Sequence, residues 1–76
     1  MSELPCVSAK QAIAAFGKLG FFETRTHGSH VILKKDGHPH SLSVPMHGNR
    51  DLKPGTLRGL IRASGCTVEQ FVASLS

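Results

Sequence analysis

The sequence predicts an α+β fold in two layers, with helices covering one face of a three-stranded antiparallel sheet. Segments with helical spacing of apolar residues stand at both ends of the chain, and short turns divide the region between them into three strand-like runs. The resulting order is α-β-β-β-α with a short extra helix at the C-terminus. Such an order buries one face of the sheet and leaves the other open to a partner.

The first helix is expected to begin after Ser8. Gln11, three residues further on, completes a capping-box pattern, and Gly20 is a typical C-terminal stop. The apolar residues at helical spacing between these signals are Ala9, Ala12, Ile13, Phe16 and Leu19.

Three short strands and two turns follow this helix. The strands are expected at residues 21–26, 30–35 and 40–44, and the turns at residues 27–29 and 36–39. Connections this short make an antiparallel meander the economical topology. Alternation along the second strand then places His30, Ile32 and Lys34 on one face of the sheet.

Two more helices are expected in the last third of the chain. Residues 46–53 have no period and are interpreted as a loop, after which Pro54 suits the first turn of a second helix and Gly65 ends it. Thr67 and Gln70 repeat the capping-box spacing and predict a short final helix.

Gly59 is the odd residue of the second predicted helix. A glycine inside a helix costs about 1 kcal/mol relative to alanine. We therefore expect this turn of the helix to pack closely on another backbone.

Length and charge narrow the class of protein. A chain of 76 residues has room for one modest core, so we expect a single domain over residues 1–76. Nine Lys and Arg against five Asp and Glu give a net charge of +4. This balance favours a polyanionic partner, nucleic acid first and an acidic protein second.

The spacing of the two cysteines and the length of the apolar runs indicate the cellular compartment in which the protein acts. Cys6 and Cys66 stand far apart, with no metal-binding or redox spacing between them. No run is apolar enough to span a bilayer, and the first residues lack the pattern of a signal peptide. We therefore expect a cytoplasmic protein with reduced thiols.

The order of helices and strands is also that of double-stranded-RNA-binding domains, which read RNA through its phosphates and 2′-hydroxyl groups. Many small α+β proteins share this order, so the basic residues carry more weight. Lys53 stands at the start of the second helix, where free N–H groups favour phosphate, and Arg58 and Arg62 are neighbours one turn apart. Taken alone, these two arginines also fit an ordinary solvated helix face. The candidate RNA-binding residues are Arg25, Gly28, Ser29, Lys34, His47, Lys53, Arg58 and Arg62.

His30 is the candidate catalytic residue. It follows Gly28 and Ser29 at the mouth of the first hairpin, and it opens the second strand. Histidine side chains in general exchange protons near neutral pH, which suits acid–base catalysis. A lone histidine in a turn is more often a plain surface residue, so this assignment depends on the rest of the chain.

Five segments, in this order, resemble the HicA toxin family. They are Leu19-Gly20-Phe21, Gly28-Ser29-His30, Val44-Pro45-Met46-His47, Leu52-Lys53-Pro54-Gly55-Thr56-Leu57 and Val68-Glu69-Gln70-Phe71. The resemblance implies a fold like that of double-stranded-RNA-binding domains. It also implies a ribonuclease toxin of a bacterial type II toxin–antitoxin pair, which cuts mRNA, inhibits translation and is silenced by a HicB-type antitoxin. The family's catalytic histidine corresponds to His30, and the antitoxin is expected to cover that site.

RNA cleavage needs little from the protein, because RNA carries its own nucleophile, the 2′-hydroxyl. One well-placed imidazole to move protons and cations near the phosphate can do much of this, and no metal and no cofactor is expected. Ser29 and the hairpin backbone are candidate phosphate contacts, with Arg25, Lys34 or Lys53 as cationic support. The second acid–base group is not identified by the sequence; His47 is one candidate and is equally well a loop histidine.

Two alternatives stay open at this point. The first is a non-catalytic RNA-binding module of the same fold, which would keep the basic surface and have no need of His30. The second is a metal site, because the chain has five histidines. Their spacing matches no standard zinc pattern, which makes the metal site the weaker alternative.

Overall fold

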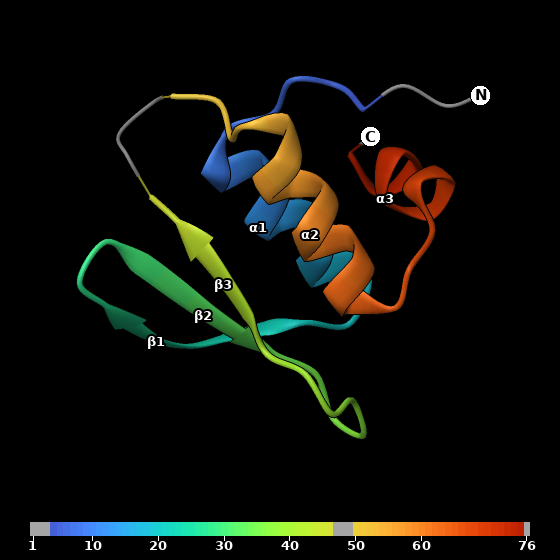
Figure 1. The fold of residues 1–76 in the computed structure, drawn as a ribbon. Coiled ribbons are helices and arrows are strands. Elements are labelled where there is room, and N and C mark those ends of the chain that lie inside the picture. The colour runs from blue at the N-terminus through green and yellow to red at the C-terminus, as the bar shows by residue number, and fades with distance from the viewer. Residues whose placement is uncertain (1–3, 47–49, 76) are drawn as a thin grey trace.

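The order of secondary-structure elements agrees with the predicted α+β fold. The structure, a computed structural model, describes residues 4–46 and 50–75. Its elements are helix α1 (Ala9–Lys18), strands β1 (Phe22–His27), β2 (His30–Lys34) and β3 (Leu42–Pro45), and helices α2 (Pro54–Ser64) and α3 (Val68–Ser74) (Figure 1). Each strand begins or ends one or two residues from its predicted bounds. In the described part of the chain, no helix has the length and apolar character needed to cross a membrane.

Both predicted capping boxes are present. The backbone N–H of Gln11 donates to the Ser8 hydroxyl at 3.2 Å, and the backbone N–H of Ser8 donates to the Gln11 side chain at 2.8 Å. Thr67 and Gln70 repeat the arrangement at the start of α3, at 3.0 and 2.8 Å. Each box satisfies two backbone donors that a helix start otherwise leaves unpaired, which fixes where α1 and α3 begin.

The sheet is an antiparallel meander in the order β1-β2-β3. α1 and α2 lie over one face of this sheet (Figure 1). Val31 and Leu33 of β2 and Val44 of β3 are buried beneath them, whereas Ile32 and Ser43, which alternate with these residues, lie on the other face. The expectation that helices cover one face is therefore confirmed for α1 and α2. The short helix α3 packs on α1 instead, with the Phe16 and Phe71 rings 5.0 Å apart.

A β-bulge at Thr24 divides β1 into two halves. Glu23 pairs with Leu33 and Arg25 pairs with Ile32, so Thr24 is an extra residue, and its hydroxyl donates to the Ile32 carbonyl at 3.1 Å. Because side chains alternate along a strand, one inserted residue reverses the facing of those beyond it. As a result, Arg25 lies on the face away from the helices.

The segment before α2 is more ordered than the predicted loop over residues 46–53. Asp51 forms an isolated antiparallel bridge with Ser8, and the N–H of Leu52 donates to the Val7 carbonyl at 2.8 Å. Leu52 is buried in the core that Val7 also joins. This pairing ties the start of α2 to the start of α1 and so fixes the position of Lys53, the residue that precedes α2.

The expected close packing at Gly59 is wrong. A Cβ atom added at this position would meet no atom within 4 Å beyond its own helix, and the residue is exposed. The helix therefore carries the conformational cost of a glycine at this point without a packing reason for it.

Candidate active site on the open face of the sheet

His30 is the first residue of β2, and its side chain is exposed. Two residues, Gly28 and Ser29, connect β1 to β2, and His27 and His30 are paired on either side of them. Gly28 has a φ of +62°, and no residue other than glycine has a positive φ among the described ones. A positive φ at the first of two turn residues only is the pattern of a type II′ turn, whose twist suits a tight hairpin.

The face of the sheet that points away from α1 and α2, here called the open face, carries His30. Residues directly opposite one another on neighbouring strands share a face, so the strand register defines its rows. The rows are His27, His30 and Pro45; then Arg25, Ile32 and Ser43; then Phe22 and Lys34. No acidic residue occupies these positions, and the two cations are Arg25 and Lys34. The open face therefore suits a polyanion.

Five of the predicted site residues come together here. Gly28 and Ser29 form the turn beside His30, Arg25 lies one row from His30, and Lys34 lies two rows away. At about 3.3 Å per residue, the backbone of Lys34 is about 13 Å from that of His30, and the Arg25 row is about 7 Å away. Arg25 is thus placed to meet the same phosphate as His30, and Lys34 to meet a neighbouring one.

The other predicted cations belong to α2. Lys53 is exposed and lines a hollow of about 260 Å³ together with Arg50, with the acidic Asp51 and with Pro45, the residue that pairs with His30. The hollow connects the start of α2 to the His30 end of the sheet. Arg58 and Arg62 are exposed on α2 itself, which lies over the other face of the sheet (Figure 1). His47 lies outside the described residues.

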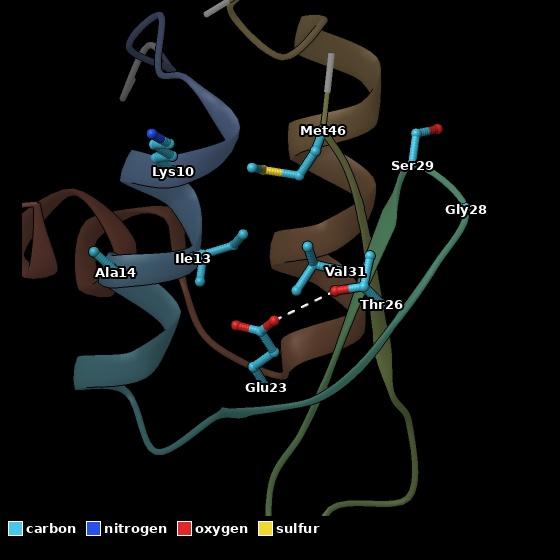
Figure 2. Close-up of a pocket in the computed structure, with 9 residues that line it drawn as sticks. All are labelled: Lys10, Ile13, Ala14, Glu23, Thr26, Gly28, Ser29, Val31 and Met46. Carbon is cyan, nitrogen blue, oxygen red and sulfur yellow. Dashed lines mark hydrogen bonds between the residues drawn. The ribbon is translucent and has the colours of Figure 1, made fainter. Parts of the chain in front are cut away.

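A second hollow, of about 540 Å³, lies between α1 and the hairpin. Figure 2 shows Ile13 of α1 and Val31 of β2 facing each other across it, with Lys10 and Glu23 at its rim. The Thr26 hydroxyl donates to the Glu23 carboxylate at 3.4 Å. Because Val31 points to the helix side, this hollow and the His30 side chain lie on opposite sides of the hairpin.

His27 is the residue of this region that the sequence interpretation missed. The sequence predicts a three-residue turn over residues 27–29, whereas the structure makes His27 the last residue of β1, exposed and directly opposite His30. The available signal was Gly28-Ser29, since a two-residue turn pairs the residues that flank it.

The remaining described histidines are engaged elsewhere. His38 Nε2 lies 2.7 Å from the Ala63 carbonyl oxygen near the end of α2, and its ring packs edge-on against Phe21 and His40. Within residues 4–46 and 50–75, no group of three or more His, Cys, Asp and Glu side chains is close enough to hold a metal ion.

Comparison with known proteins identifies the family. The model of the HicA toxin of bacterial toxin–antitoxin systems matches residues 9–66, from the start of α1 to just beyond α2. A search of curated proteins gave no significant match. The matched segment covers most of the 76 residues and includes the three strands, the His27–His30 hairpin and α2. The chain therefore belongs to the HicA toxin family of bacterial toxin–antitoxin systems.

Proposed function

We propose that this toxin is a metal-independent endoribonuclease that cleaves mRNA and thereby inhibits translation, with His30 as a catalytic acid–base residue. The observation that carries the proposal is the position of His30: exposed, at the start of a strand and on a face whose paired positions hold cations and no carboxylate. Rigid elements hold catalytic groups more exactly than loops do, and a cationic face attracts the RNA backbone.

The reaction follows from the chemistry of RNA. The 2′-hydroxyl attacks the adjacent phosphorus, and the 5′-oxygen of the next nucleotide leaves. His30 either takes the proton of the 2′-hydroxyl or supplies a proton to the leaving oxygen, a contribution of about 10²- to 10⁴-fold in rate. Arg25 stabilises the charge that develops on the non-bridging oxygens, and the Ser29 hydroxyl and the turn backbone orient the phosphate.

The other cations extend the RNA-binding surface in this proposal. Lys34 contacts a phosphate further along the open face, and Lys53 contacts RNA that leaves the site near Pro45. Arg58 and Arg62 contact phosphates only when the RNA is long enough to reach the helix side of the sheet. His47, in the segment that precedes Lys53, is kept as a candidate RNA contact.

The toxin family implies an antitoxin partner. We infer that this partner is of the HicB type, that it covers the His30 hairpin, and that its contact surface is acidic, because the toxin has a net charge of +4. The toxin is proposed to act in the cytoplasm, as a single domain over residues 1–76.

A cleavage assay tests the enzymatic proposal against the alternative of a non-catalytic RNA-binding module. Purified toxin is incubated in a chelator with an RNA labelled at both ends. We expect fragments with 2′,3′-cyclic phosphate or 3′-phosphate ends and with 5′-hydroxyl ends. Binding without any cleavage would support the non-catalytic alternative, and 5′-phosphate ends would identify water as the nucleophile.

A further inference from the structure

We propose that His27 is the second proton-transfer residue of the site, so that His27 and His30 act as a pair on one phosphodiester. The inference rests on the proposed ribonuclease function and names the acid–base group that this function still requires. It assigns a catalytic role to the last residue of β1, opposite the first residue of β2.

The strand register carries the geometry. His27 and His30 are direct partners across the two-residue turn, and both side chains are exposed on the open face. Directly opposite residues on one face have Cβ atoms about 4.5–5.5 Å apart. Two imidazoles at that spacing can reach two oxygens of the same phosphate group.

The hairpin is held from both sides, which fixes the pair. On one side β1 and β2 pair from Phe22 to His27, and on the other side the N–H of Met46 donates to the Ser29 carbonyl at 2.6 Å. The bulge at Thr24 puts Arg25 on the same face as His27, so the two imidazoles and one guanidinium share a surface.

The imidazoles of His27 and His30 have no other side-chain partner among the described residues. Among the residues that the structure describes, no side-chain hydrogen bond, ion pair or ring contact involves the imidazole of His27 or of His30. His38, in contrast, bonds to a carbonyl oxygen and packs against two rings. Both members of the pair are therefore available to a ligand.

No described carboxylate occupies a paired position of the open face. Glu23 of β1 pairs with Leu33, which places it on the helix side of the sheet, where it accepts a hydrogen bond from Thr26. Among the paired positions of the open face, His27 is the described acid–base group directly opposite His30.

The pair completes the proton transfers of the reaction. One imidazole takes the proton from the 2′-hydroxyl as the bond between the 2′-oxygen and phosphorus forms. The other, protonated beforehand, gives its proton to the 5′-oxygen as the bond between phosphorus and that oxygen breaks. The products are a 2′,3′-cyclic phosphate and a 5′-hydroxyl. The first imidazole has gained one proton and the second has lost one, so the number of protons is unchanged.

Single-turnover cleavage of a short RNA tests the proposal with His27→Ala, His27→Arg and His30→Ala, and with His40→Ala as the matched control. His40 is exposed like His27 but lies between β2 and β3, outside the paired rows of the open face. We expect His27→Ala to lower the single-turnover rate constant at saturating toxin by about 10²- to 10⁴-fold, with little change in the toxin concentration that gives half the maximal rate, and His40→Ala to leave both values unchanged. His27→Arg should be as slow as His27→Ala, because arginine keeps its charge and does not exchange protons.

A second substrate assigns the two roles. When sulfur replaces the 5′-oxygen at the cleavage site, the leaving group needs no proton. Loss of the general acid then no longer lowers the cleavage rate. We expect this substrate to restore the rate of one of the two alanine variants and not of the other. Restoration of both or of neither would overturn the paired assignment.

The remaining outcomes distinguish a failure of the His27 assignment from a failure of the proposed ribonuclease function. Wild-type activity in His27→Ala, or full activity in His27→Arg, would show that His27 is not a proton-transfer residue while leaving the ribonuclease intact. If the wild type cleaves no RNA, or if His30→Ala cleaves as fast as the wild type, the proposed function fails as well.

Discussion

The backbone N–H of Met46 donates a hydrogen bond of 2.6 Å to the carbonyl oxygen of Ser29, in the turn that precedes His30. Ser29 and Met46 continue the register in which His30 lies opposite Pro45, so this bond extends the antiparallel ladder between β2 and β3 by one pair. The turn is therefore fixed to β3 as well as to β1. A catalytic group gains from such support, because a misplacement of about 1 Å can cost about 10²-fold in rate.

His30→Ala should abolish RNA cleavage and growth arrest without unfolding the protein. The side chain is exposed on the face of the sheet opposite the core, so the free energy of unfolding should change by less than about 0.5 kcal/mol. Cleavage assays and thermal melts on the same preparation check both parts. An active and folded variant would refute the catalytic role, and His40→Ala serves as the control for loss of an exposed imidazole.

Gly28→Ala should destabilise the protein through the backbone alone. The φ of +62° is unfavourable for any residue with a Cβ atom, whereas the added methyl would meet nothing within 4 Å. We expect a loss of about 1–2 kcal/mol in chemical denaturation. The same strain shifts the turn under His30, so cleavage should fall even at temperatures where the variant remains folded. Full stability and full activity together would show that the turn does not need glycine.

Gly59→Ala should have the opposite effect on stability. The position is exposed, has no positive φ and leaves open space around an added Cβ, so only the helix propensity changes. A gain of about 0.5–1 kcal/mol in the free energy of unfolding is expected, with unchanged cleavage. Destabilisation would reveal a contact of this helix that the isolated chain does not show.

The helices and the facing of the sheet are largely predictable from local patterns, and the details of the site are not. Ser8 with Gln11 and Thr67 with Gln70 fix helix starts through bonds made within four residues, so the sequence alone reveals them. The bulge at Thr24 depends on how β1 registers against β2, and no local pattern signals it. The pairing of His27 with His30 was missed for a related reason, because it requires the turn to contain two residues rather than three.

Removal of charge from the open face should weaken RNA binding in a salt-dependent way. We expect Arg25→Gln and Lys34→Gln each to reduce the slope of log affinity against log salt by about 0.7, the value for one phosphate contact on a single strand. Arg58→Gln and Arg62→Gln are the matched controls from the helix side of the sheet: they should leave the binding of a short oligonucleotide unchanged and affect only longer RNA. Equal effects of all four changes on a short RNA would place the binding surface elsewhere.

The antitoxin should bury the hairpin that carries His30. The open face is uncovered in the toxin, with every residue of β1 exposed, so a partner that covers the turn would block the proposed site directly. Amide hydrogen exchange on the free toxin and on its complex with the co-encoded antitoxin measures this. Protection should rise at Gly28, Ser29 and His30, and RNA cleavage should stop at one equivalent of bound antitoxin. Helix α3 packs on α1, away from this face, and provides the internal reference. Protection confined to α3, with the hairpin exchanging as in the free toxin, would mean that the antitoxin inhibits without covering the site.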